Sequence, residues 1–565
     1  MSYPGGFGRD VNTEKVQESP ADSLGSANAT HIFDDGIAFK HDLHRKLGAR
    51  QVTMIAIGGA IGTGLLIGTG SALAQAGPAS ILIAYAVVGF VVFLVMCALG
   101  EMASFMPLPQ SFAGFATRFV DPAFGFATGW CYYFKYIITT PNQLNAAALV
   151  IQYWLPASRV NPGVWIAVFL VTVVTINYFG VKIFGEFEFW MSSIKVIVIL
   201  GVIFLSLIIA AGGVPGQPAR GFEYWGNPGA FNTYIAKGAE GKFLAFWSSL
   251  TTAVFAYLGT ELVAVTAGEI TRSYKTIPRA IKLTFWRILV FYVVSVFFLG
   301  MCVPYNSPLL LQANKKGLSA SASPFVVAIL IAGIPVLPAI LNGAILLFVI
   351  SASNSDLYIA SRTLYGLACQ RKAPAIFART DRRGVPHVSL FFSSLFCLLG
   401  FLNVRSSAAS IFSYFVSVIS IFGLVVWISI LYTHICFQRA CRVQGINRKR
   451  DLPYQAPFSP YGSYVALIFC CIIAVFKGFN SIAGQNGFNY KTFITSYIGI
   501  PVYLVLIFGY KIFYRTRRVR SVEADLVTGR VNIAKEEEEY EAYQSARPPR
   551  RAAHLFYDKF VGLLF

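Results

Sequence analysis

The sequence predicts an all-α integral membrane protein with about twelve transmembrane helices. Of its 565 residues, 56% are hydrophobic and only 13% are charged, a composition with too few charges to cover a water-soluble fold of this size. Apolar runs of about 20 residues, the length that crosses a bilayer, also recur along the chain. The expected solvent, and the first expected partner, is therefore the lipid bilayer.

Twelve apolar runs follow one another, separated by polar connections. They lie at 52–75, 79–103, 123–153, 163–180, 188–212, 245–268, 284–304, 336–366, 388–403, 408–436, 462–483 and 492–513. A further apolar segment at 322–334 is short and interrupted, so we expect it to lie along the outer surface. An even number of spans places both ends of the chain on one side of the membrane.

The basic residues predict which side that is. The net charge is +20, but Lys and Arg occur in short blocks in alternate connections, which is typical of membrane topology and not of a nucleic-acid-binding surface. Because basic connections face the cytoplasm, we expect cytoplasmic tails at 1–50 and 514–565 around a transporter domain at 51–513. The polar start of the chain predicts no cleaved signal peptide.

Other functional classes find little support. The nine cysteines form no spaced CxxC pair and no His cluster accompanies them, so we expect no disulfide framework, metal site or cofactor. No nucleophile-and-base set indicates an enzyme. The C-terminal tail carries the acidic run "KEEEEYEAYQ", which is either a solvated face or a signal for trafficking or ubiquitin-ligase adaptors.

The first span is rich in glycine. Its stretch "IGGAIGTGLLIGTG" predicts a break at Gly62, Thr63 and Gly64, because each helical glycine costs about 1 kcal/mol relative to alanine. A break within the membrane is tolerated where it lines a cavity, and its free N–H groups suit a carboxylate. Close packing of helices through small residues is the alternative.

The sixth span is interrupted by Gly259 and an acid, Glu261. Two interrupted helices five spans apart indicate a transporter built from an inverted repeat, with its site near the middle of the membrane. Glu261 is either a gate or proton carrier, or a structural hydrogen-bonding acid. The interrupted helices favour alternating access over a channel.

Two further spans carry polar residues that suggest coupling. Lys195 lies in apolar surroundings in the fifth span, and burial favours loss of its proton. Its alternative role is to reach the inner interface with its long side chain. The eighth span carries a polar group within "FVISASNSDLYIASRTLYGLA", namely Ser351, Ser353, Asn354 and Asp356.

The third span carries a polar stripe. Lys135, Thr139, Asn142 and Gln143 fall on one helical face, beside Pro141. An ionisable residue costs about 2.5 to 3.5 kcal/mol within the membrane and by default marks a functional site with a partner. That partner is either a transported anion or an acid on another helix, such as Glu261.

Five ordered stretches over residues 43 to 515 resemble the fungal amino acid permeases of the amino acid, polyamine and organocation superfamily. The matching stretches are "LHRKLGARQVTMIAIGGAIGTGLLIGTG", "GEMASFMPL", "FGEFEFW", "TAGEITRSYKTIPRAI" and "NSDLYIASRTLYGLA". The resemblance implies a five-plus-five inverted repeat with two extra helices, discontinuous helices 1 and 6, and proton-coupled uptake at the plasma membrane.

The resemblance also implies which residues hold the substrate. Its carboxylate would meet Gly62, Thr63 and Gly64. Its ammonium would meet carbonyl groups near Ile57, Phe255, Ala256 and Leu258. Lys195 matches a lysine that related carriers use in place of a sodium ion.

Within that family the stretches "FKYIITTPNQLNAAALVIQYW", "RVNPGVWI" and "YKTFITSYIGIPVY" most resemble permeases for dicarboxylic amino acids. Most relatives have asparagine in place of Lys135 and glutamate in place of Gln143, so both departures favour an anionic substrate. We therefore expect proton symport of L-glutamate and L-aspartate, with Lys135 as counter-ion and Asn142 and Gln143 as its hydrogen-bonding neighbours. A broad or neutral amino acid permease and a non-transporting amino acid sensor are the alternatives.

Overall fold

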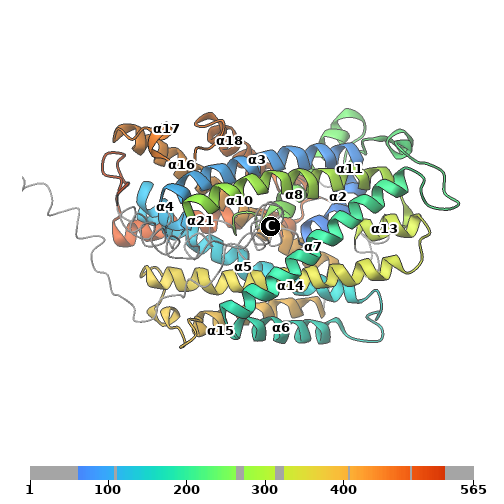
Figure 1. The fold of residues 1–565 in the computed structure, drawn as a ribbon, viewed down its shortest axis with the longest axis horizontal. Coiled ribbons are helices and arrows are strands. Elements are labelled where there is room, and N and C mark those ends of the chain that lie inside the picture. The colour runs from blue at the N-terminus through green and yellow to red at the C-terminus, as the bar shows by residue number, and fades with distance from the viewer. Residues whose placement is uncertain are drawn as a thin grey trace, which may run out of the picture. The chain divides into compact units, whose positions relative to one another are not determined.

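The described part of the chain is a bundle of helices. The computed structural model describes residues 62–106, 108, 111–262, 273–311, 323–404, 408–483 and 487–527, and within these ranges it contains helices and no strand. α3, α5 and α14 run along the same direction through the bundle (Figure 1). In chain order the elements are η2 (Gly64–Gly68), α2 (Thr69–Ala76), α3 (Pro78–Phe105), α4 (Ser111–Phe119), α5 (Pro122–Ile151), α6 (Pro162–Tyr178), α7 (Val181–Ala210), η3 (Trp225–Gly229), α8 (Gly238–Tyr257), α10 (Ser273–Arg287), η5 (Ile288–Val294), α11 (Ser295–Cys302), α13 (Pro324–Ile331), α14 (Leu337–Cys369), η6 (Ala375–Ala378), α15 (His387–Phe396), η7 (Cys397–Val404), α16 (Ala408–Val443), α17 (Arg448–Asp451), α18 (Tyr461–Phe476), α19 (Asn480–Ala483), α20 (Tyr490–Tyr497) and α21 (Gly499–Tyr514).

Six helical stretches in the described residues are long and apolar enough to cross a membrane. A bent pair, α20 and α21, adds a seventh if its two parts form one span. α5 and α8 have 30 and 20 residues but are not among the six, because polar side chains lower their hydropathy. These two less apolar helices meet at the site described below.

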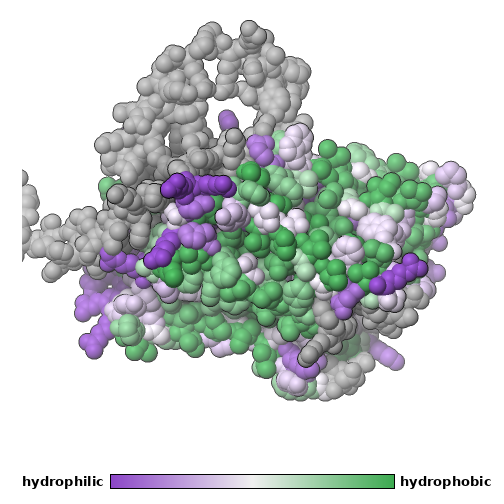
Figure 2. Space-filling model, turned by 90° about the horizontal axis from the view of Figure 1, so that it is seen from below, coloured by the Kyte–Doolittle hydropathy of each residue, from purple (hydrophilic) through white to green (hydrophobic). Residues whose placement is uncertain are grey.

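The outer surface of the bundle fits a lipid environment. Figure 2 shows a broad hydrophobic area on one face, with hydrophilic residues gathered toward its ends. On α7, large apolar side chains such as Trp190, Ile197 and Phe204 are exposed. Lipid hydrocarbon removes such side chains from water without a protein partner.

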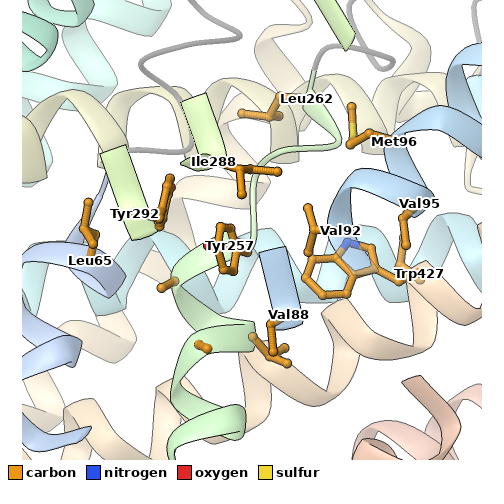
Figure 3. Packing of buried hydrophobic residues seen from close by; sticks show 14 of the residues in the cluster. Leu65, Val88, Val92, Val95, Met96, Tyr257, Leu262, Ile288, Tyr292 and Trp427 are labelled. Atoms are coloured by element: carbon orange, nitrogen blue, oxygen red, sulfur yellow. The ribbon is translucent and has the colours of Figure 1, made fainter. Parts of the chain in front are cut away.

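The centre of the bundle is tightly packed around the end of α8. Tyr257 stacks on Tyr292 with ring centroids 4.4 Å apart, and its hydroxyl group donates a hydrogen bond to the carbonyl oxygen of Tyr85 at 2.8 Å. Ile288 lies near the same ring, and Val92 lies between this group and Trp427 (Figure 3). α3, α8 and the α10–η5 helix are thereby held together next to the point where α8 ends.

α5 passes through the middle of the bundle and packs against α14 and α16. It begins after Asp121, whose side chain accepts a hydrogen bond from the N–H of Ala123 at 2.8 Å, and Pro122 occupies the first turn. Both are typical helix-start residues. The polar stripe is thus carried inward and not toward lipid.

The apolar segment at 322–334 forms a short helix that packs against the bundle. α13 covers most of it, and Val326 and Val327 are completely buried. The ring of Pro324 lies against Gly70 on α2, 3.3 Å from where a Cβ would be. At eight residues α13 is too short to cross a membrane, and its apolar side chains are buried against neighbouring helices.

Candidate functional site

A small cavity lies where the first span meets the end of α8. It has a volume of about 40 Å³, which leaves room for a few water molecules at most. Its walls come from the glycine-rich first span, α5, the end of α8, α14 and α16. The lining residues are Gly62, Thr63, Gly64, Lys135, Tyr136, Thr139, Gln143, Phe255, Ala256, Leu258, Gly259, Ala352, Asp356 and Ile419.

The sixth span is discontinuous at this cavity. α8 ends at Tyr257, Leu258 is extended with φ −63° and ψ 141°, and Gly259 has φ +99°. Glycine adopts this positive φ without the strain that a side chain would add. The chain therefore turns away from the helix axis, which leaves the last carbonyl groups of α8 at the cavity.

The first span approaches α8 at very short range. A Cβ built on Gly64 would lie 2.5 Å from the Cα of Ala256, so only glycine fits between the two backbones. η2 begins at Gly64 and leads into α2. Ile57 and the rest of the first span before Gly62 lie outside the described residues.

Lys135 and Glu261 form an ion pair beside the cavity. The ammonium group of Lys135 donates a hydrogen bond to Oε1 of Glu261, and both residues are only 1% exposed. This is the structural pairing that competes with a transported anion as the explanation of Lys135. The contact joins α5 to the turn that follows α8.

Aromatic side chains surround the pair. The Nζ atom of Lys135 lies 4.5 Å from the ring centroid of Tyr136 and 5.4 Å from that of Tyr132, distances suited to cation–π attraction. Oε2 of Glu261 accepts hydrogen bonds from the N–H of Gly259 at 3.2 Å and from the indole N–H of Trp427 at 3.5 Å. Aromatic rings therefore stabilise the charge of Lys135, and N–H groups stabilise that of Glu261, in addition to the ion pair itself.

Several buried polar atoms around the cavity have no hydrogen-bond partner among the described residues. They include the hydroxyl group of Thr63, Oε1 of Gln143 and Oδ2 of Asp356. Buried polar groups left unpaired cost about 1 to 3 kcal/mol each. Their convergence on one cavity favours a polar ligand there, or water in its absence.

The polar stripe on α5 is only partly exposed to the cavity. Thr139 and Gln143 line it with Lys135, whereas Asn142 is buried outside the lining. At about 100° per residue, Asn142 lies about 20° to one side of Lys135 and Gln143 about 80° to the other. The cavity faces the Gln143 edge of the stripe.

The remaining predicted coupling residues lie apart from the cavity. Lys195 is completely buried and lies 3.5 Å from Oε1 of Glu188, so it does not extend to an interface as its alternative role requires. The Ser351 hydroxyl group donates a hydrogen bond to Oε2 of Glu188 at 2.8 Å. Ser353 is buried nearby on α14 but does not line the cavity.

Some cavity residues were not among the predicted binding residues. Asp356 is the clearest, because an acid in the middle of the eighth apolar run is a signal that the sequence does contain. Tyr136 and Ile419 gave no such signal, since a buried aromatic or aliphatic residue is ordinary in a membrane helix. In the described ranges, no three His, Cys, Asp or Glu residues are grouped to hold a metal ion.

Comparison with known proteins agrees with this architecture. The family model "Amino acid permease" matches residues 51–522. The chain is 50% identical to a dicarboxylic amino acid permease of Saccharomyces cerevisiae, over 98% of this chain and 92% of the relative.

Permeases with other specificities are also similar. A lysine-specific permease of the same yeast is 40% identical over 87% of this chain and 79% of its own length. A proline-specific permease of Saccharomyces cerevisiae is 39% identical over 98% of this chain and 90% of its own length. The chain is thus a multi-pass membrane protein, and it belongs to the amino acid permease family.

Proposed function

We propose that the protein is a proton symporter that carries L-glutamate and L-aspartate inward across the plasma membrane. The observation that carries this proposal is the buried Lys135–Glu261 pair at a cavity where the glycine-rich first span packs closely against the end of α8. The similarity to a dicarboxylic amino acid permease supports the acidic substrate. Lysine-specific and proline-specific permeases are also similar to the chain, so family membership does not identify the substrate. The proposal therefore depends on the charges at the cavity.

The pair provides a route to coupling. While Glu261 is charged, it holds the ammonium group of Lys135. When Glu261 takes up a proton, that attraction is lost and Lys135 needs another anion, because an unpaired buried charge is costly. The side-chain carboxylate of the substrate supplies it. Proton and acidic substrate then bind together, and neither is favoured alone.

The interrupted helices bind the groups that all amino acids share. The free N–H groups where the helix begins at Gly64 suit the α-carboxylate, and the carbonyl groups that end α8 at Phe255 and Ala256 suit the ammonium group. The hydroxyl group of Thr63 is unpaired among the described residues and lines the same cavity. Backbone groups thus bind the α-carboxylate and the ammonium group that all amino acids share, and Lys135 binds the carboxylate of the substrate's side chain.

Inward transport as net positive charge requires at least two protons for each monoanionic substrate. Glu261 beside the cavity and Asp356 in its lining are the two acids available there. We assign one proton to each. Glutamate addition should produce an inward current in voltage-clamped cells, and an outward current, or none at any pH, would contradict this stoichiometry.

The cavity is smaller than the proposed substrate. A volume of about 40 Å³ is too small for an amino acid, so we expect the helices that line it to separate when substrate binds. Alternating access involves such movement of helices around a fixed site. The cytoplasmic placement of both tails belongs to the same proposal and follows from the basic connections. Use of the tails by trafficking or ubiquitin-ligase adaptors would depend on the acidic run in the C-terminal tail.

Radiolabelled glutamate uptake tests the function directly. Fungal cells lacking their own acidic amino acid carrier would express the wild type, Lys135→Asn, or Lys449→Asn at matched surface levels. Lys449 is an exposed lysine on α17, so it controls for simple loss of charge. We expect Lys135→Asn to lose glutamate uptake and to retain or gain neutral substrates, while Lys449→Asn resembles the wild type.

The ion pair also favours one competing function. If Glu261 is the permanent partner of Lys135, the lysine is structural and the protein is a broad or neutral amino acid permease. Strong competition by leucine or phenylalanine, together with equal glutamate uptake by Lys135→Asn, would establish that reading. Counterflow from preloaded cells separates both carriers from a sensor, which would show none.

A further inference from the structure

A second, larger cavity lies next to the central one. It has a volume of about 440 Å³, within the range of sites for small molecules. α2, α8 and α16 form its walls, and the turn between α18 and α19 closes one side with α20. Phe255 lines both cavities, so the two lie in series along the end of α8.

The lining of this cavity has one kind of charge. Its described residues include nine Ser or Thr and a single ionisable cation, Lys477, and they include no Asp or Glu. Hydroxyl groups can donate or accept hydrogen bonds, so they do not select between charges. Lys477 is therefore the source of positive charge in the described lining, and this charge favours binding of an anion.

Lys477 is buried without a carboxylate partner in the described part of the protein. Its side chain is 7% exposed, and its Nζ atom donates one hydrogen bond, to the carbonyl oxygen of Ser417 at 3.0 Å. Among the described residues, the two other buried lysines are Lys135 and Lys195, and each lies within 4.0 Å of a glutamate. Since an ammonium group has three donors, most of the hydrogen-bonding capacity of Lys477 is unused.

A neighbouring amide is also unpaired. Oδ1 of Asn480, which lines the same cavity one turn after Lys477, is buried and has no hydrogen-bond partner among the described residues. An amide that can accept and donate beside a free ammonium group matches an amino acid, which carries both signs of charge. A purely structural lysine would not require this second unpaired group.

We propose that this cavity is a second binding site for the acidic amino acid, with Lys477 binding one of its carboxylates before the substrate passes Phe255 to the central site. The proposal rests on the proposed function for the identity of the anion. The ring of Phe255 lies 6.4 Å from that of Phe412, edge to face, and both line the larger cavity. Because Phe255 lines both cavities, we expect movement of its ring to open a passage between them.

The alternative is that Lys477 only joins α18 to α16 through the Ser417 carbonyl group. Charge-selective labelling separates the two roles without requiring transport. Ser413 lines the cavity and is exposed, so Ser413→Cys provides a reporter thiol. Membrane-impermeant methanethiosulfonates bearing either a sulfonate or a trimethylammonium group would be compared on intact cells, with the parent chain as the background for its native cysteines.

We expect the ratio of anionic to cationic labelling rates at Ser413→Cys to fall about fivefold or more when Lys477→Gln is added, by Coulomb's law over a few ångströms of partly hydrated cavity. Lys491→Gln is the matched control, because Lys491 is an exposed lysine on the neighbouring α20. It should leave the ratio unchanged. An unchanged ratio in Lys477→Gln would overturn the proposal, whatever the protein transports.

Two further readouts identify the anion. Glutamate should slow labelling of Ser413→Cys, and this protection should be lost with Lys477→Gln. In uptake assays Lys477→Gln should raise the glutamate KM by roughly 10-fold, the loss of one charged hydrogen bond, with a smaller effect on the maximal rate. If the labelling ratio depends on Lys477 but glutamate gives no protection, the cavity is anion-selective and the assignment of acidic amino acids to it is overturned.

Discussion

Lys135 on α5 and Glu261 in the turn after α8 are each other's ion-pair partner, although 126 positions separate them in the sequence. Lys135 lines the small cavity where the first span meets the end of α8, and Glu261 lies beside that cavity. The contact therefore joins the proposed counter-ion of the substrate, Lys135, to the proposed proton-binding acid, Glu261. Glu261 itself lies just after the end of α8. Four further predictions follow from this arrangement and its surroundings.

Replacing Glu261 with glutamine should uncouple transport from protons. Glutamine resembles the protonated acid, so Lys135 stays free for substrate at every pH. We expect glutamate counterflow to continue with little pH dependence, while concentrative uptake driven by an imposed pH gradient disappears. Both are measurable with labelled glutamate in vesicles. Pumping that persists at the wild-type level would show that Glu261 is not a coupling acid.

Removing only one member of the pair should destabilise the protein. Lys135→Met leaves Glu261 buried without its cation, and such single losses cost about 3 to 5 kcal/mol. Lys135→Met combined with Glu261→Gln should recover most of that stability, since neither charge remains. Thermal midpoints of the purified proteins in detergent provide the comparison. A double variant no more stable than Lys135→Met would contradict a direct pairing.

Gly64→Ala should abolish transport. The added Cβ would be 2.5 Å from the Cα of Ala256, a backbone atom that cannot rotate away, so the first span and α8 would have to separate. Gly343→Ala is the control, because its Cβ meets nothing within 4 Å and alanine favours a helix. Uptake at matched surface levels should fall to background in the first variant and remain in the second.

Asp121 gives a pH-dependent prediction outside the spans. Burial raises the pKa of this carboxyl group, but hydrogen bonds from Lys511, the N–H of Ala123 and Thr516 outweigh burial, and the net pKa lies below its ordinary value of 3.8. A lowered folded pKa means that Asp121 stabilises the protein fully above pH 3.8 and less as the pH falls below it.

Asp121→Asn keeps a helix-capping side chain and removes the charge. The difference in thermal midpoint between the wild type and Asp121→Asn should therefore be present at pH 7 and shrink below pH 3.8. A difference that stays constant across this range would show that the charge of Asp121 contributes nothing to stability. The contact matters because Lys511 and Thr516 tie the end of α21 to the start of α5.

Much of the fold follows from local composition. The apolar runs at 79–103 and 336–366 become α3 and α14, because a long apolar segment in lipid satisfies its backbone groups only as a helix. Glycine at 259 marks the interruption of the sixth span for a similarly local reason, its tolerance of positive φ. The charge of Lys135 and the acid Glu261 are visible as exceptions within apolar runs.

The sequence by itself predicted which segments are long and apolar enough to cross a membrane, where the sixth helix is interrupted, and that the third span carries a cation away from lipid, since each depends on neighbouring residues alone. Only the tertiary structure decided that Lys135 meets Glu261, that Gln143 rather than Asn142 faces the cavity, that α13 is buried, and that Lys477 lacks a described acid. These facts depend on how helices far apart in sequence rotate and pack against each other, and no periodicity within one helix specifies its neighbours.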